Sequence, residues 1–255
     1  MNKLEKTYGR AVKTAIWFIK PFKRIFIRTL CEVHIFINEQ ALEILKNDGY
    51  TEAYVFFDKY RKALNDGVVW ADQDFRSREH FYNPYNHKGL YGCKSSKQRF
   101  TQYYGKALVY WDGGDHEKAI FYLGAAVHLI QDSTIPQHGN VNLLKSHRSY
   151  ERWVKEVHDD FLHYTVKNNG VYLDNPYCYI DCNSKKSIEA YRRYALIRDN
   201  NEKYFKIANS TFPTAQRTTA GCLLNFCNTV NETGKDSGNG GMEADCECEH
   251  GHNHV

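Results

Sequence analysis

Apolar positions recur with a helical period along most of the chain, and strand-like alternation is hard to find. The clearest helix is DHEKAIFYLGAAVHLIQD at residues 115–132, where Asp115 can cap the first turn and Pro136 forces the chain out of helical geometry just beyond the end. Further helices are predicted at residues 31–49, 51–67, 96–114, 147–167, 186–208 and 213–230. The first two of these end in an Asp-Gly pair, which is typical of a helix C-terminus. The pattern predicts an all-α fold.

Two segments depart from this pattern. A long piece rich in Gly, Asn and aromatic residues interrupts the helices at residues 67–96. The tail at residues 233–255 lacks the apolar residues needed for a core, which predicts a flexible segment. It is either an incidental polar tail or a segment that binds zinc or copper. The second alternative arises because the tail carries the metal-binding residues Cys246, Cys248, His250, His252 and His254. We therefore predict one multi-helix domain at residues 31–232, preceded by a separate segment at residues 1–30.

Length and composition fit this organisation. A chain of 255 residues with 42% hydrophobic residues can bury one sizeable core. No uninterrupted apolar run of about 18 residues exists, which argues against a membrane-spanning helix. The net charge of +4 hides an asymmetry, because residues 1–30 carry a net of +7 and residues 231–255 a net of −5.

The basic segment at residues 1–30 mixes Lys and Arg with Trp, Phe and Ile. Its longest apolar stretch, TAIWFI, is too short for a secretory signal, which leaves a cytoplasmic or membrane-peripheral location open. The segment either lies on an anionic membrane surface or packs on the core as a first helix. Without a clear export signal we expect free thiols, although Cys178 and Cys182, and likewise Cys222 and Cys227, are close enough in sequence to pair.

Five residues of zinc-binding types follow one another in VHLIQDSTIPQHGNVNLLKSHRSYE. His128 and Asp132 are four residues apart and project from one face of the clearest helix, and His147 and Glu151 repeat that spacing on the next helix. His138 lies on the Pro-broken connection between them. A lone His on an apolar helix is usually a satisfied core residue, but five such residues at this spacing favour one shared metal cavity.

Three more candidates lie upstream. His34 falls among the apolar residues of its helix, and Asp72 and His80 lie eight residues apart in the irregular segment. Each alone would more often be structural or exposed. Together with the five they make eight nitrogen and oxygen donors suited to zinc.

The segments FYLGAAVHLIQDSTIPQHGNV and HRSYERWV resemble the zinc-dependent phospholipase C family, which includes bacterial phosphatidylcholine-preferring enzymes and the catalytic domain of clostridial α-toxin. The family is related to the S1/P1 nuclease fold. The resemblance covers residues 31–165 and implies two or three zinc ions. It implies one ion surrounded by Asp72, His80, His128 and Asp132, a second held by His138, His147 and Glu151, and a third held partly by His34 with Asp132 bridging.

The resemblance also implies an activity. Zinc ions would bind the phosphate of a phospholipid and supply a hydroxide that releases diacylglycerol and a phosphorylated headgroup. Asp72 would orient or deprotonate the attacking water, or act as a ligand only. The rival enzyme is a single-strand nuclease, whose motif typically ends in Asp where this chain has Glu151. The other rival is a non-catalytic metal- or membrane-binding protein on the same scaffold. We expect a monomer with no nucleic-acid partner.

The chain departs from the family pattern in two places. The family's N-terminal Trp, which helps to hold the third zinc, has no counterpart shortly before His34, where Cys31 is either a substitute ligand or a buried inert residue. Choline-binding members carry aromatic residues at the positions of Gln73 and Ser77. Because quaternary ammonium groups bind aromatic faces, a choline headgroup is not expected to be preferred. No C-terminal lipid-binding sandwich is expected in the polar tail.

Overall fold

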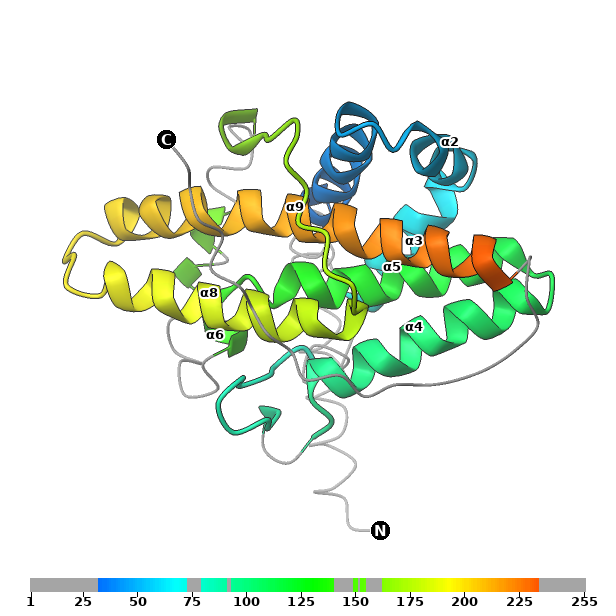
Figure 1. The fold of residues 1–255 in the computed structure, drawn as a ribbon. Helices are drawn as coiled ribbons and strands as arrows, with labels where there is room; N and C mark the ends of the chain where they lie inside the picture. The colour runs from blue at the N-terminus through cyan, green and yellow to red at the C-terminus, as the bar shows by residue number, and fades with distance from the viewer. Residues whose placement is uncertain are drawn as a thin grey trace, which may run out of the picture.

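The protein is a bundle of helices in the computed structural model, which describes residues 32–72, 79–90, 93–139, 149–150, 152–154 and 162–233 (Figure 1). The described helices are residues 32–47, α2 (Thr51–Lys59), α3 (Arg61–Ala71), α4 (Ser96–Asp112), α5 (His116–Asp132), α6 (Pro136–Gly139), α8 (Tyr179–Arg193) and α9 (Asn200–Thr233), with a 3-10 turn, η4, at Pro176–Cys178. Among these residues the only β pairing is an isolated bridge between Asn83 and Lys88. The predicted all-α fold is confirmed.

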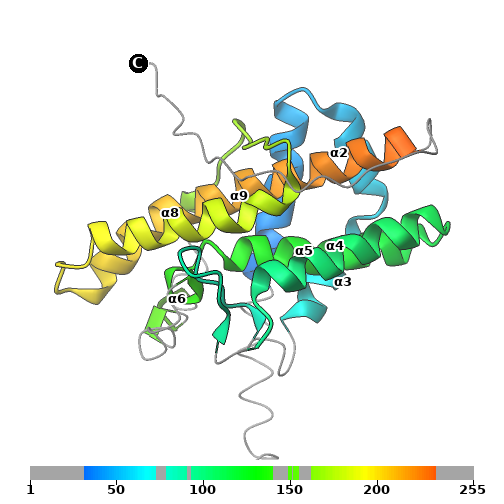
Figure 2. The ribbon, with the colours of Figure 1, turned by 60° about the horizontal axis from the view of Figure 1, so that its bottom comes forward.

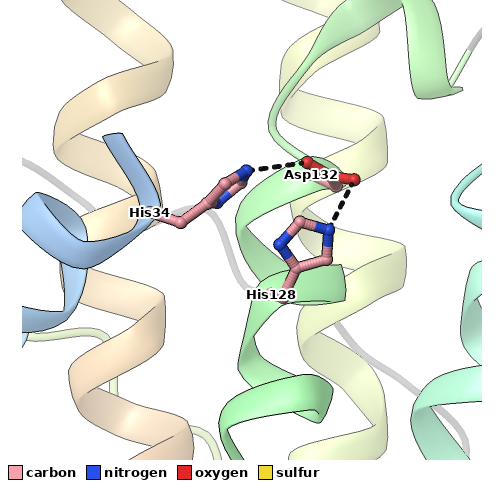
Figure 3. Close-up of side chains that lie close together, drawn as sticks. All are labelled: His34, His128 and Asp132. Carbon is pink, nitrogen blue, oxygen red and sulfur yellow. Dashed lines mark ion pairs between the residues drawn. The ribbon is translucent and has the colours of Figure 1, made fainter. Parts of the chain in front are cut away.

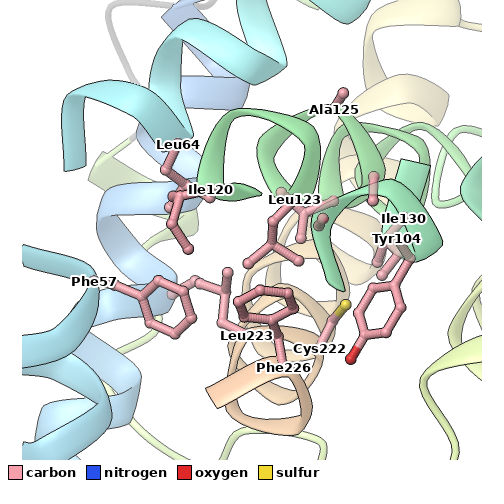
Figure 4. Close-up of a cluster of buried hydrophobic side chains, with 14 of the residues drawn as sticks. Phe57, Leu64, Tyr104, Ile120, Leu123, Ala125, Ile130, Cys222, Leu223 and Phe226 are labelled. Atoms are coloured by element: carbon pink, nitrogen blue, oxygen red, sulfur yellow. The ribbon is translucent and has the colours of Figure 1, made fainter. Parts of the chain in front are cut away.

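Helix α5 lies at the centre of the bundle. It packs against α3 and α4 along its length and also contacts α8 and α9 (Figure 1, Figure 2). Every residue from Leu123 to Asp132 is buried. Burying one large aliphatic or aromatic side chain contributes about 1.5–3 kcal/mol, so the apolar contacts around α5 fix its position firmly. Figure 4 shows part of this core, which includes Phe57, Leu64, Tyr104, Ile120, Leu123, Ile130, Leu223 and Phe226.

The ends of α4 and α5 follow the sequence prediction. Ser95 and Gln98 form a reciprocal capping box at the start of α4. The Asp115 side chain accepts a hydrogen bond from the backbone N–H of Lys118, so it caps α5 as expected. Gly114 has a φ of +80° in the short turn between the two helices, a conformation that favours glycine. The cap and the turn set α5 antiparallel to α4.

The single helix predicted at residues 51–67 is wrong in two respects. The chain breaks at Tyr60 into α2 and α3, and α3 continues through Gly67 to Ala71. Gly67 does not end a helix; it lets α3 approach α5 closely, because an added Cβ would lie 2.0 Å from the carbonyl oxygen of Phe121. The longer α3 carries the chain to Asp72 at its C-terminal end.

The two helices predicted at residues 186–208 and 213–230 also differ from the structure. Helix α8 starts earlier and ends at Arg193, and α9 runs without interruption past Pro213. A proline inside a helix removes one backbone hydrogen bond. The apolar face of α9 on either side of the proline is buried in a second core cluster, and this burial offsets the loss. The second cluster consists of Val33, Ile37, Tyr150, Trp153, Val154, Tyr164, Tyr204, Ile207, Ala208, Phe212 and Ala215.

The remaining predictions have mixed outcomes. The helix predicted at residues 147–167 is too long, because residues 162–164 form a 3-10 turn and residues 165–167 are not helical. Within the described part of the chain, no helix is both long and apolar enough to cross a membrane. The predicted segments at residues 1–30 and 233–255 lie outside the described residues, apart from Thr233 at the end of α9.

The expectation of free thiols is wrong for two cysteines. Cys178 and Cys182 are disulfide-bonded, whereas Cys93, Cys222 and Cys227 are free. The prediction failed because it used the lack of an export signal, which bears on the compartment and not on whether sulfur atoms meet in the fold.

Candidate metal centre

The candidate site is built around Asp132, in the last turn of α5. His128 lies one turn before it on the same buried face, and His34 reaches the same carboxylate from the helix of residues 32–47. Figure 3 shows these three side chains pointing toward one another from the two helices. The i, i+4 spacing read from the sequence therefore produces the predicted geometry.

Four imidazole rings surround the Asp132 carboxylate. Its Oδ2 atom lies 2.7 Å from His80 Nδ1, 3.3 Å from His128 Nε2 and 3.4 Å from His138 Nδ1. Its Oδ1 atom lies 3.5 Å from His34 Nε2. All five residues are buried, with relative exposures of 6% or less.

Backbone hydrogen bonds tie together the segments that bring His80 and His138 to α5. The segment after His80 is fixed to α6, because the N–H of Tyr82 donates to the carbonyl of His138 at 3.0 Å. The same segment is fixed to the start of α4 by the N–H of Ser96, which donates to the carbonyl of Phe81 at 3.1 Å. The irregular stretch between α3 and α4 is therefore a support for His80 rather than a featureless loop.

Asp72 completes the described part of the cluster. It caps the C-terminal end of α3 and is half-buried, and it offers an oxygen within 4.8 Å of donor atoms of His80 and His128. Donor atoms of His34, His128 and Asp132 form a second group with the same spacing. The structure thus brings together six of the eight predicted residues, and the other two, His147 and Glu151, lie outside the described part of the chain.

Burial sets the charge of the imidazoles. Burial lowers the pKa of His34, and nearby His128 lowers it further; burial likewise lowers the pKa of His128. Both rings are therefore neutral at neutral pH, which is the form that ligates metal. Burial alone would also lower the pKa of His80, but its hydrogen bond to Asp132 raises that pKa above the usual value.

The charge of Asp132 follows from its surroundings. Burial alone would raise its pKa, but His128 and His138 and the hydrogen bonds from His128 and His80 hold the pKa well below the usual value. A buried carboxylate thus stays ionised among buried imidazoles. This charge pattern is suited to binding a divalent cation.

The spacing of the donors fits zinc. Two ligands about 2.1 Å from a tetrahedral zinc ion are about 3.4 Å apart. His80 Nδ1 and His128 Nε2 are 3.4 Å apart, and three of the four distances from imidazole nitrogens to Asp132 are 3.3–3.5 Å. The Nδ1 atom of His128 is buried and has no hydrogen-bond partner among the described residues. Polar atoms are rarely left in this way unless they serve a function.

One residue that supports the site was missed in the sequence. The Oε1 atom of Gln131 lies 2.7 Å from His34 Nδ1, and its Nε2 donates to Asn38 Oδ1 at 2.8 Å. Because the amide nitrogen is turned toward Asn38, the amide oxygen accepts from His34 Nδ1–H and leaves the His34 Nε2 lone pair facing Asp132. The only signal in the sequence was a polar residue within the apolar stretch of α5.

Comparison with known proteins agrees with this geometry. A family model described as "Zinc dependent phospholipase C" matches residues 33–214, a range that includes all eight predicted metal ligands. The chain belongs to the zinc-dependent phospholipase C family.

Individual relatives are more distant. The chain is 25% identical over 237 residues to a phospholipase C of Clostridium novyi, covering 78% of this chain and 59% of the relative. It is 25% identical over 194 residues to a phospholipase C of Bacillus cereus, covering 68% of this chain and 66% of the relative. The alpha toxin of Clostridium absonum has a similar fold, with a TM-score of 0.68 and 21% identity over 80% of this chain and 65% of the toxin. The chain thus spans about three fifths to two thirds of the length of these two relatives.

Proposed function

We propose that this protein is a phospholipase C, which hydrolyses the phosphodiester bond of a phospholipid and releases diacylglycerol and a phosphorylated headgroup. The observation that carries the proposal is the buried Asp132 carboxylate shared by four imidazoles, in a chain of the zinc-dependent phospholipase C family.

We assign a bridging role to Asp132. One imidazole lone pair binds one ion, so His128 belongs to a single metal site even though it lies within reach of two donor groups. Asp132 has two oxygens that face different partners: Oδ2 faces His80 and His138, and Oδ1 faces His34. This division supports a site for more than one ion, with Asp132 between them.

Bound zinc supplies a Lewis acid that polarises the phosphate and makes a coordinated water acidic. The residues of the chain hold this chemistry in place: the neutral rings of His34 and His128 offer lone pairs, and Gln131 orients the first of them. We assign the acceptance of the water's proton to Asp72. Its half-buried position at the edge of the cluster supports this role, because the other carboxylate among the described residues of the cluster, Asp132, is enclosed by imidazoles.

The headgroup is part of the proposal. Gln73 and Ser77 offer no aromatic face for a quaternary ammonium group, so we expect weaker turnover of phosphatidylcholine than of other headgroups. Release of phosphorylated headgroups from a panel of diacyl phospholipids measures this preference, and a clear preference for choline would contradict it. We also propose that the basic segment at residues 1–30 contacts the membrane surface.

Metal counting combined with hydrolysis tests the function. The purified protein is expected to hold two or three zinc ions and to hydrolyse phospholipid, and His128→Ala and Asp132→Asn are expected to abolish turnover and lower the zinc content. A variant with Cys246 and Cys248 changed to Ser is the matched control, because it removes soft ligands from the tail and leaves the cluster intact.

Three results would contradict the proposal. Full turnover in either site variant would remove the cluster from the reaction. Zinc lost only in the tail variant, with no hydrolysis by the unaltered protein, would favour a metal-binding protein. Cleavage of single-stranded DNA without cleavage of phospholipid would favour the nuclease.

A further inference from the structure

The end of the α8–α9 hairpin exposes an apolar residue. Leu196 lies in the turn that joins the two helices and is 95% exposed. The turn is not loose, because Tyr191 and Tyr194 on either side of α8's last residue pack against the second core cluster. Leu196 is therefore exposed to solvent on a turn that the two packed tyrosines hold in place.

Two exposed side chains join the end of α8 to the segment that carries His80. The guanidinium of Arg192 lies over the ring of Tyr85, 5.5 Å from its centroid, and Tyr85 is 54% exposed. Tyr85 belongs to the segment of residues 79–90, which carries His80 into the site.

Helix α8 also packs against α6, which carries His138. Gly139, at the end of α6 and next to His138, lies close enough to Ile188 that an added Cβ would be 3.2 Å from its Cγ1 atom. Ile188 is one turn before Arg192 on α8. Figure 2 shows α6 beside the α8–α9 hairpin. Tyr85 and Arg192 thus belong to segments that neighbour the candidate site, and Leu196 follows Arg192 in the turn at the end of α8.

The surface around the turn is positively charged. Residues 185–206 carry seven Lys or Arg against three Asp or Glu, a net of +4 that equals the net charge of the whole chain. Arg192, Arg193 and Arg198 are exposed, and none has an ion pair with another described residue. Their charges are therefore available to an anionic partner.

We propose that Tyr85, Arg192, Arg193, Leu196 and Arg198 form a surface, here called the hairpin surface, that docks the protein on an anionic phospholipid membrane. A protruding aliphatic residue enters the acyl region, a tyrosine lies at the headgroup level, and arginines attract anionic lipids. The proposal rests on the proposed function, because an enzyme that acts on membrane phospholipid must bring its site to the surface. It names a contact that is separate from residues 1–30.

Vesicle binding tests the hairpin surface. Zinc-loaded full-length protein is incubated briefly in the cold with vesicles of phosphatidylcholine, with or without a minority of phosphatidylserine, and the bound fraction is measured after sedimentation. Leu196→Gln is expected to lower the partition coefficient about tenfold on both kinds of vesicle. Arg193→Gln and Arg198→Gln are expected to lower it about fivefold each, only where phosphatidylserine is present.

The other end of the bundle provides matched controls. Val109 is 71% exposed in the last turn of α4 and Lys106 is exposed one turn earlier. The C-terminal end of α4 lies at the opposite end of the bundle from the α8–α9 turn (Figure 1). Val109→Gln and Lys106→Gln remove the same kinds of group and are expected to leave vesicle binding unchanged. Melting temperatures of all variants check that none has lost its fold.

The proposal would be overturned by hairpin variants that bind vesicles like the unaltered protein, or by control variants that lose as much binding. Binding of single-stranded DNA that is lost in the same arginine variants, without vesicle binding, would also overturn it. Turnover of a short-chain phospholipid present as monomers tests the proposed function separately, since no surface is needed. Vesicle binding without such turnover would refute the proposed function alone.

Discussion

Gln131 offers a sharp test of how the metal centre is supported. Its amide is 1% exposed and joins His34 Nδ1 at 2.7 Å to Asn38 Oδ1 at 2.8 Å. Gln131→Leu keeps a similar volume but leaves a buried donor and a buried acceptor without their partner. Each unpaired buried polar group costs about 1–3 kcal/mol, so for two such groups the free energy of unfolding is expected to fall by about 2–6 kcal/mol. The orientation of His34 would also be lost, and such outer-shell changes lower metal affinity by about 10–100-fold.

Gln137 is the matched control for this change. It is also fully buried, but neither atom of its side-chain amide has a hydrogen-bond partner among the described residues. Gln137→Leu therefore removes a buried amide without breaking a bond, and the free energy of unfolding is expected to stay the same or rise. Comparing the two variants separates the effect of the Gln131 bonds from the general effect of placing Leu near the site.

The measurements are urea unfolding of metal-free protein, zinc titration against a competing chelator, and ¹⁵N NMR of the histidine rings. In the unaltered metal-free protein, His34 is expected to carry its proton on Nδ1, and Gln131→Leu is expected to give a mixture of tautomers. The reasoning is refuted if Gln131→Leu unfolds at the same urea concentration as Gln137→Leu and keeps the unaltered zinc affinity and tautomer.

Three further changes have defined outcomes. The hydrogen bond to Asp132 raises the pKa of His80, so a proton competes with metal for this ring near neutral pH. Zinc binding should therefore release protons and weaken as pH falls. Calorimetry in buffers of different ionisation enthalpy measures the proton release, and a zinc affinity independent of pH would contradict the prediction. Asp48 accepts hydrogen bonds from two backbone N–H groups and a tyrosine hydroxyl. Burial alone would raise the pKa of Asp48, but these hydrogen bonds lower it below the usual value. The stability that ionised Asp48 contributes should be present above the unfolded pKa of about 3.9 and be lost as pH falls through the folded pKa. Asp48→Asn should therefore make the free energy of unfolding depend less on pH in the acid range. Gly67→Ala should lower the free energy of unfolding, measured with urea, by about 2 kcal/mol or more, because the added Cβ would meet a carbonyl oxygen of α5. Gly105→Ala, with open space around the new Cβ, should raise the free energy of unfolding by about 0.5–1 kcal/mol. Equal effects of the two glycine substitutions would contradict the close approach of α3 and α5.

The success of the sequence in predicting α5 has a physical reason. Its start is signalled by a capping residue, its end by Pro136, and its buried face by spacing alone, so His128 and Asp132 could be placed on one face before any tertiary contact was known. The same reasoning identified His34 as a candidate, because it is a polar ring among the apolar residues of its helix. Local chemistry was sufficient wherever the element is defined by its own residues.

The errors occurred where tertiary packing decides the conformation. Gly67 looked like a helix stop, but its use is the close contact with α5, which no local pattern reveals. The sequence predicted separate helices before and after residues 209–212, but burial on both sides of Pro213 keeps α9 continuous. Gln131 was missed for the same reason, since its role depends on His34 and Asn38, which are about 95 residues away in sequence.

The position of Asp132 explains how a fold can hold so many polar groups in its interior. A buried carboxylate and four buried imidazoles oppose folding unless each has a partner. The cluster therefore needs a support that does not depend on it, and α5 provides one, because its apolar residues pack against α3, α4, α8 and α9 along its length. The other predicted ligands come from separate segments, each tied back by its own bonds: Gln131 for His34, and the backbone hydrogen bond between Tyr82 and His138 for the segments that carry His80 and His138. The geometry of the candidate metal centre is thus set by the core of α5 and by hydrogen bonds outside the predicted ligands, which is why a predicted ligand and its support can be separated by mutation.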